Sequence, residues 1–427
     1  MLHRGIRKWD LVLMIINSII GAGIFGLPSD IFKATNVYSI AAFVACAAIV
    51  LVFILCFAEV SSRFDKTGGP YVYILSAFGK FPAFLMGWLL LLSRIFNYAT
   101  LINMLVTYLS LFYAPLQDPV PRIVVIVVVS IFLTYINHIG IRNMARLSNI
   151  TTIAKLAPLA VFIIAGLFFL NTGSFNASQT PGFPAFSKAV LLLVFAFGGF
   201  ESVLVGSGEI NNPSRTLPFA LFTATAVVAI FYILIQVVCI GTLPGLAESK
   251  RPIAEAASNF MGKTGGKMIA LGAFISIVGT LNVLLFSGSR LPYAFSEEGQ
   301  FPKWFSFVNN RYKTPTVSLL VVSVLVIITS IAFSFLAALT VATIIRVTVY
   351  LLVCASLIRL RKKFPGQRDY YKLKYGNLLA VAGIGLSVWL LSAAKLTELR
   401  NVAILLGIGL LVYLMQINSR KNHKKNK

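Results

Sequence analysis

The sequence predicts an all-α membrane protein with about twelve transmembrane helices, ten of them forming two inverted five-helix repeats and two lying at the periphery. Three observations indicate this fold class: the composition, the number of long apolar runs, and a pair of glycine-rich interruptions. Of the 427 residues, 58% are hydrophobic and only 12% are charged. That is more apolar surface than a single water-soluble core can bury, so the chain is expected to be polytopic.

A bilayer core roughly 30 Å thick needs about 20 apolar residues per helix, which sets the length of each expected span. The segment 316–359 can be divided in more than one way, and every boundary is approximate. The candidate runs are 10–33, 38–60, 82–112, 120–138, 149–170, 187–208, 218–243, 267–291, 316–335, 337–359, 376–394 and 402–417.

The first run, 10–33, is interrupted by Gly21-Ala22-Gly23-Ile24-Phe25-Gly26. An interior glycine destabilises a helix by roughly 1 kcal/mol, so this cluster predicts that the helix unwinds in mid-membrane. Backbone groups freed there must line a protein-enclosed cavity, which makes the break a candidate binding site. The same residues match the G-x-G-x-x-G dinucleotide pattern, but the preceding strand and the later acidic residue that this pattern requires are missing.

The sixth run, 187–208, is interrupted in the same way by Phe197-Gly198-Gly199-Phe200-Glu201. Paired interruptions at matching places in two halves are typical of the substrate site of a secondary transporter. We therefore expect repeats over 10–170 and 187–360, inverted because five spans is an odd number. Two additional helices over 376–417 and a basic cytoplasmic tail over 418–427 follow. The alternative is that the glycines only allow close helix packing.

The formal net charge of +24 is concentrated on one side of the membrane if twelve spans alternate in direction. By the positive-inside rule, both termini then lie in the cytoplasm of a plasma (inner) membrane. These residues are expected to contact anionic lipid headgroups and not nucleic acid. The main basic residues are Arg4, Arg7, Lys8, Arg142, Arg146, Arg359, Arg361, Lys362, Lys363, Arg368, Lys372, Lys374, Arg420, Lys421, Lys424, Lys425 and Lys427.

Helix ends supply the chemistry of the candidate site. The amides at Gly21, Ala22 and Gly23 lie at the N-terminus of the second half of the broken helix, where the dipole favours an anion such as a carboxylate. The carbonyls near Ile20 and across 195–198 offer acceptors for an ammonium group. The two ends of a zwitterionic amino acid would thus have partners without any charged side chain.

Five motifs, in order along the chain, resemble those of the amino acid–polyamine–organocation (APC) superfamily of permeases. The resemblance extends to the end of the tenth run, with Ser296-Glu297-Glu298-Gly299 standing where the family usually has an Asp-Gly pair. The motifs are Ile20-Gly21-Ala22-Gly23-Ile24-Phe25-Gly26-Leu27-Pro28, Gly68-Gly69-Pro70-Tyr71, Phe197-Gly198-Gly199-Phe200-Glu201, Asn212-Pro213-Ser214-Arg215-Thr216-Leu217-Pro218, and Ser289-Arg290 with Gly299-Gln300-Phe301-Pro302.

This resemblance implies a leucine-transporter-type fold and transport of amino acids. It places a gating aromatic residue at Phe195, while Phe197 and Gly198 complete the predicted substrate site around the second break. Glu201 is the only acidic residue expected deep within a span, where a carboxylate is costly and usually functional. Because the family has this acid with different substrates, we expect a structural or gating role for Glu201 and not recognition of a cationic substrate.

Lys155 lies about 10 Å inside the fifth run by helical rise. It could extend its ammonium back to the cytoplasm. The resemblance instead implies that the ammonium occupies the site where sodium-coupled relatives bind a cation, between the first and eighth runs, with Thr280 as its partner. The expected mechanism is sodium-independent and proton-coupled, and obligatory exchange is the alternative.

Arg94 and Arg346 are also expected near mid-depth, where either could pair with Glu201, cap a carbonyl end or favour an acidic substrate.

An enzyme is not expected, because the three histidines lie at termini or a loop edge and show no metal-ligand spacing. No metal or cofactor is predicted. A channel or non-transporting sensor on the same fold stays an alternative. The sequence leaves open the substrate's side chain and any partner subunit.

Overall fold

The computed structural model describes residues 5–110, 113–176, 180–332, 335–365, 370–394 and 396–425. These residues are overwhelmingly helical. The β-structure among them is an isolated parallel bridge between Ile6 and Ile210. The predicted all-α class is therefore confirmed.

Fifteen α-helices follow one another along the described chain, and their bounds fix where the functional residues lie. They are α1 (Lys8–Ile19), α2 (Ala22–Thr35), α3 (Ser39–Ser62), α4 (Pro70–Phe78), α5 (Lys80–Leu109), α6 (Pro119–His138), α7 (Ile141–Leu167), α8 (Phe183–Phe197), α9 (Phe200–Leu204), α10 (Pro213–Thr242), α11 (Pro252–Glu297), α12 (Thr316–Ala332), α13 (Phe335–Lys363), α14 (Gly376–Ser392) and α15 (Leu396–Lys425).

Nine helical segments of the described chain are long and apolar enough to cross a membrane, judged by length and composition. Two further apolar helices, α12 and α14, are shorter. The structure thus agrees with a polytopic membrane protein, while the number of twelve spans stays a prediction. The first predicted run is divided between α1 and α2, and the sixth between α8 and α9.

Several helices extend beyond the apolar runs that predicted them. The fifth run was expected to begin at 149, but α7 begins at Ile141. The eighth run was expected over 267–291, whereas α11 extends from Pro252 to Glu297. α11 also contains a non-helical residue, Gly262, with φ 68°. The reason is that hydropathy follows only the lipid-length apolar core, whereas polar first and last turns remain helical. The same holds for α15, which passes the predicted start of the tail at 418 and ends at Lys425.

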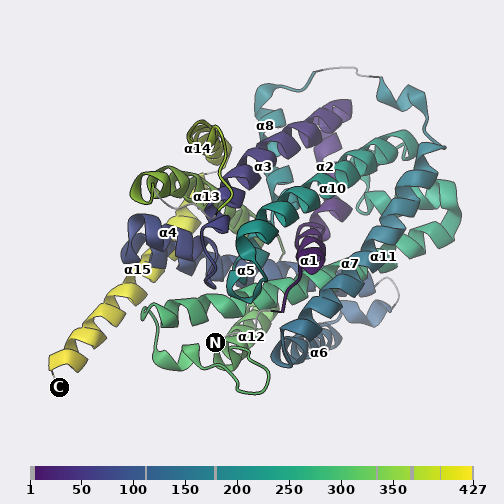
Figure 1. Ribbon diagram of the computed structural model, residues 1–427. Helices are drawn as coiled ribbons and strands as arrows, with labels where there is room; N and C mark the ends of the chain where they lie inside the picture. The colour runs from purple at the N-terminus through teal and green to yellow at the C-terminus, as the bar shows by residue number, and fades with distance from the viewer. Residues whose placement is uncertain are drawn as a thin grey trace.

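The core of the bundle surrounds α1. This helix packs against α7, α9, α10 and α11, and α11 in turn packs against α5 and α7. Figure 1 shows α1 in the middle of the bundle, while α15 runs outward to the C-terminus at one edge. Every residue of α1 from Met14 to Ile19 is buried. The end of α1, and therefore the first break, lies deep inside the protein.

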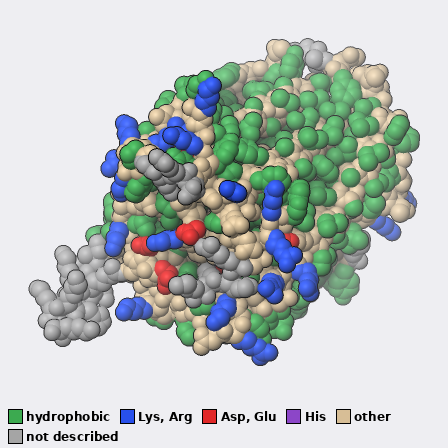
Figure 2. Space-filling view, in the orientation of Figure 1, with side chains coloured by type: hydrophobic (Ala, Val, Ile, Leu, Met, Phe, Trp, Pro, Cys, Tyr) green, Lys and Arg blue, Asp and Glu red, His purple; other side chains and the backbone are tan. Residues whose placement is uncertain are grey.

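One face of the molecule has an apolar region and a basic region (Figure 2). Figure 2 shows a broad hydrophobic expanse over one part of this face, with Lys and Arg side chains gathered toward the part where Figure 1 places the N-terminus. The N-terminal segment is fixed there, because the amides of Gly5 and Ile6 donate to the carbonyl of Glu209 at 3.0 and 3.1 Å. Such a distribution is typical of a membrane protein with one basic side.

Candidate functional site

The first break consists of Ile20 and Gly21, which separate α1 from α2. The amide of Gly21 donates to the carbonyl of Ile19 at 2.8 Å, so this amide is used within the turn. The N-cap of α2 has no side-chain hydrogen bond. Because the first four amides of a helix lack intrahelical partners, those at Ala22, Gly23 and Ile24 are the donors that remain at this end.

The second break consists of Gly198 and Gly199, between α8 and α9. Gly199 has φ 121°, a conformation that other residues rarely adopt. The hydroxyl of Ser18 donates to its carbonyl at 2.7 Å, and a Cβ added at Gly199 would overlap the carbonyl oxygen of Ser18. The two breaks therefore lie against each other, which the sequence could suggest only by analogy between the halves.

Replacing Gly199 by alanine should destabilise the protein, since the alanine would meet both a positive φ and the Ser18 carbonyl. The strain of a left-handed residue alone is roughly 1–2 kcal/mol. Gly26→Ala is a matched control, because Gly26 lies within α2 and a Cβ there would meet nothing within 4 Å. We expect thermal unfolding in detergent to show a lower midpoint for Gly199→Ala and an equal or higher one for Gly26→Ala. Equal midpoints for both variants would contradict this close contact.

A small cavity lies where the two breaks meet. It offers about 30 Å³ to the centre of a water molecule, which suffices for about two waters and not for an amino acid. Its walls must therefore move to admit a solute. The cavity is lined by Ser18, Ile19, Gly21, Gly23, Asn97, Leu101, Phe195, Ala196, Gly198, Gly199, Thr280, Leu284 and Arg346.

The two phenylalanines of the predicted site differ in position. Phe195 lines the cavity, and the guanidinium of Arg346 lies 5.4 Å from its ring centre. Phe197 is buried on another side of α8 and packs edge-on against Tyr232, with ring centres 5.0 Å apart. Two residues that are two positions apart in a helix point in different directions. Only Phe195 is therefore placed to cover a bound solute.

Gly23 both lines the cavity and packs against a neighbouring helix. A Cβ at this position would lie 3.0 Å from the Cα of Ala196 on α8, a tight contact. At Gly21 a Cβ would meet the hydroxyl of Thr280 at 3.4 Å. The sequence offered close helix packing as the alternative role of the glycines. Gly23 does both: it packs closely against α8, and it lines the cavity at the break.

Lys155 is completely buried and does not extend toward the surface. Its ammonium donates to three carbonyls: that of Ile20 at 2.6 Å, that of Asn17 at 3.1 Å and that of Ser276 at 3.3 Å. An ammonium has three donors, and all three are used here. The charge thus joins the end of α1 to α11 across the first break.

Two hydroxyls on α11 complete this arrangement. Thr280 donates to the carbonyl of Asn17 at 3.0 Å, and Ser276 donates to the carbonyl of Ile20 at 2.8 Å. The Ile20 carbonyl therefore holds both an ammonium and a hydroxyl, which leaves it no acceptor position for a substrate. Sequence reasoning missed Ser276, although it lies four residues before Thr280 on the same helix face.

Glu201 forms ion pairs with both Arg94 and Arg346, the two arginines that the sequence offered as alternative partners. Its Oε1 accepts from Arg94 Nη1 at 3.2 Å and from Arg346 Nε at 3.0 Å. Its Oε2 accepts from the Gly199 amide at 2.9 Å and from the Tyr350 hydroxyl at 3.1 Å. The carboxylate thus connects α5, α9 and α13 at the second break.

Arg346 also caps the first half of the broken helix. Its Nη1 donates to the carbonyl of Phe195 at 3.2 Å, near the C-terminus of α8. A Cβ on Gly198 would lie 2.5 Å from this guanidinium, so a glycine there lets the arginine reach its partners. Both interactions that the sequence offered as alternatives, pairing and capping, occur together.

Tyr232 on α10 is a further residue that sequence reasoning missed. Its hydroxyl lies 3.2 Å from the carbonyl of Ile19 and 3.2 Å from that of Ala196. It therefore contacts the ends of both broken helices. No local pattern distinguishes this tyrosine from the others in the chain, because its partners are far away in sequence.

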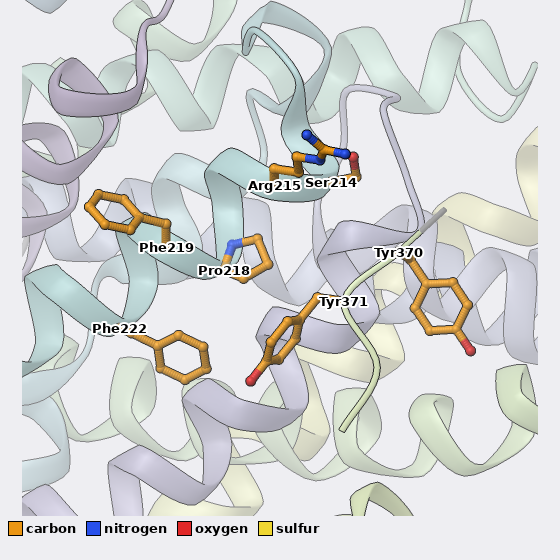
Figure 3. Close-up of a pocket in the computed structure, with 7 residues that line it drawn as sticks. All are labelled: Ser214, Arg215, Pro218, Phe219, Phe222, Tyr370 and Tyr371. Carbon is orange, nitrogen blue, oxygen red and sulfur yellow. The ribbon is translucent and has the colours of Figure 1, made fainter. Parts of the chain in front are cut away.

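A second pocket, of about 670 Å³, lies away from the breaks. Figure 3 shows Phe219, Phe222 and Tyr371 around Pro218, with Ser214 and Arg215 at the start of α10. None of the residues at the two breaks lines this pocket. It is larger than the central cavity, but it contains neither of the two helix breaks and has the N-terminus of only one helix, α10.

Comparison with known proteins places these features in context. Residues 6–412 match the family described as "Amino acid permease". The chain is 25% identical to the methylthioribose transporter of Bacillus subtilis, over all of this chain and 95% of that protein. It is 27% identical to the serine/threonine exchanger SteT of B. subtilis, with 94% of each chain covered. It is also 27% identical to the mouse b(0,+)-type amino acid transporter 1, over 74% of this chain and 68% of that protein.

Proposed function

The chain belongs to the amino acid permease family, and we propose that it is a secondary active transporter that carries small amino acids across the plasma membrane by alternating access. The relatives are named transporters and exchangers, so the family is one of carriers and not of enzymes. The observation that supports this proposal most is the meeting of two broken helices around one small cavity. A carrier must expose such a site to each side in turn.

The substrate carboxylate is assigned to the N-terminus of α2. The amides of Ala22 and Gly23 lie there, and the helix dipole adds a favourable partial charge. The substrate ammonium is assigned to the carbonyl of Ala196, which lines the cavity and accepts one hydrogen bond from Tyr232. A carbonyl oxygen has a second acceptor position, and the residue that supplies it is close to Gly23, since a Cβ added at Gly23 would lie 3.0 Å from the Cα of Ala196.

The coupling mechanism follows from Lys155. Its ammonium occupies the space between α1 and α11 that a sodium ion would need, so we propose sodium-independent transport. Proton-coupled uptake is the favoured mode, with Lys155 gaining and losing its proton during the cycle. The alternative is obligatory exchange with Lys155 permanently charged, and the named exchanger among the relatives supports it.

We further propose the membrane topology that this fold implies. Residues 10–170 and 187–360 would form the inverted repeats, and 376–417 would add two helices for a total of about twelve. The matching positions of the breaks before α2 and before α9 support the repeat. The basic segments at both ends support cytoplasmic termini.

Uptake by the purified protein in liposomes tests the proposal. All twenty amino acids would be offered with and without internal substrate, a proton gradient and sodium. We expect saturable uptake of one or more amino acids that sodium does not stimulate. Stimulation by an inward proton gradient would favour symport, and dependence on internal substrate would favour exchange. Uptake of methylthioribose without uptake of any amino acid would overturn the proposed substrate class.

A further inference from the structure

We propose that the transported amino acid has an acidic side chain, whose carboxylate binds the guanidinium groups of Arg346 and Arg94 beside the cavity. This inference rests on the proposed function, because it names the substrate class of the same site. Three observations support it: the net charge of the two arginines with Glu201, their unused hydrogen-bond donors, and their position relative to the cavity.

The charges at the second break do not balance. Arg94 and Arg346 are 1% and 6% exposed, and they share the single carboxylate of Glu201. This group of three carries a net charge of +1. An uncompensated charge in a buried site is costly unless a partner of opposite sign joins it. A substrate with an ordinary neutral side chain contributes no net charge, whereas an acidic amino acid contributes one negative charge and completes the balance.

Glu201 cannot satisfy both arginines on its own. Each of its oxygens already accepts two hydrogen bonds, from Arg94 and Arg346 on Oε1 and from Gly199 and Tyr350 on Oε2. A carboxylate offers about four acceptor positions, so all of them are in use. Any further acceptor for the guanidinium groups must come from outside this group of residues.

Both guanidinium groups retain unused donors. Arg94 has two buried nitrogens, Nε and Nη2, without a hydrogen-bond partner in the described structure. Arg346 uses Nε for Glu201 and Nη1 for Phe195, and its Nη2 has no partner among the described residues. The two Arg94 nitrogens are buried unpaired donors, which are uncommon and indicate a missing ligand or water.

Arg346 lies at the wall of the cavity where a side chain would extend, and Arg94, which does not line the cavity, is joined to Arg346 through Glu201. Arg346 lines the cavity, and it lies across Gly198 close to Phe195. Arg94 lies one helical turn before Asn97, which lines the same cavity from α5. With its α-carboxylate at α2, a substrate would therefore point its side chain toward α5 and α13.

The chemistry required is that of a small anion. A carboxylate matches the planar fork of a guanidinium, and the resulting charge-assisted hydrogen bonds are stronger than neutral ones. An inorganic anion such as chloride could neutralise the same charge. We assign the neutralising anion to the substrate side chain because Arg346 lines the cavity in which the amino acid is proposed to bind.

Competition between isosteric side chains tests the inference in the wild-type protein. Aspartate would be compared with asparagine, and glutamate with glutamine, as inhibitors of uptake into liposomes. A charge-assisted hydrogen bond is roughly twice as strong as a neutral one, so we expect at least one acidic amino acid to compete about tenfold or more better than its amide. The assay would be repeated with gluconate replacing chloride, and the preference should persist.

Substitutions at Arg346 locate the preference. Arg346→Gln should abolish the difference between acid and amide, and Arg346→Lys should retain part of it because the charge remains. Arg215→Gln is the matched control, since Arg215 is exposed and lines only the second pocket. Thermal unfolding would show whether each variant is folded, and the wild-type comparison remains decisive if a variant is not.

Each outcome has a definite meaning. An acid preference that Arg346→Gln removes supports the inference. Equal or better competition by the amides, with amino acid uptake intact, overturns the inference and leaves the proposed function standing. Neutral amino acid uptake that requires chloride also overturns it, because the inorganic anion would then supply the charge. Absence of uptake for every amino acid overturns the proposed function itself.

Discussion

Replacing Lys155 by alanine is expected to reduce uptake by about 100-fold or more, because three hydrogen bonds from one buried ammonium would be lost. These bonds hold the end of α1 against α11 at the first break. Without them the carbonyls of Asn17 and Ile20 keep only hydroxyl partners, those of Thr280 and Ser276. The loss should therefore affect the helix that must move during transport.

The measurement is reconstituted uptake of Lys155→Ala beside the wild type at several pH values, with and without sodium. Lys188→Ala is the matched control, because Lys188 is an exposed lysine in the second turn of α8. The control should transport normally, and sodium should not stimulate the wild type. Full activity of Lys155→Ala with an unchanged pH profile would remove Lys155 from the mechanism.

The second large effect is expected for Glu201→Gln. This change leaves Arg94 and Arg346 buried without the carboxylate that they share. Removing one partner of a buried ion pair is destabilising by about 3–5 kcal/mol, so we expect a marked fall in the thermal unfolding midpoint together with loss of uptake.

Glu248→Gln provides the control for this prediction. Glu248 pairs with Lys33 at 3.4 Å, but the two side chains are 80% and 62% exposed. Pairs of this kind contribute about 0–1 kcal/mol, so Glu248→Gln should leave both midpoint and uptake nearly unchanged. A Glu201→Gln protein as stable as Glu248→Gln would mean that the arginines are neutralised by another group.

The sequence predicted what depends on local chemistry. Helix breaks at Gly21 and Gly198 follow from glycine's low helix propensity, and the apolar runs follow from the need to match a bilayer. The depth of Lys155 within the fifth run left it open whether its ammonium reaches the cytoplasm, and the family resemblance implied the buried position that the structure has. Helix ends were less predictable, as α7 and α11 show, because their polar terminal turns contribute nothing to hydropathy.

What the sequence could not predict depends on contacts between distant residues. The pairing of Glu201 with both Arg94 and Arg346 joins positions 107 and 145 residues apart. The contacts of Tyr232 and Ser276 with the end of α1 span more than 200 residues. Such contacts arise only when distant helices pack together. The sequence could therefore offer either arginine as a partner of Glu201, but composition and spacing contain no signal that both are bound.

The central claim is that the cavity between the two breaks is the substrate site. The most direct measurement is the rate at which a small, water-soluble thiol reagent alkylates Leu101→Cys, a position that lines this cavity on α5. Phe222→Cys in the second pocket is the control. We predict that a transported amino acid slows alkylation at Leu101→Cys and leaves the rate at Phe222→Cys unchanged. Equal alkylation rates at Leu101→Cys with and without saturating substrate would contradict the assignment of this cavity.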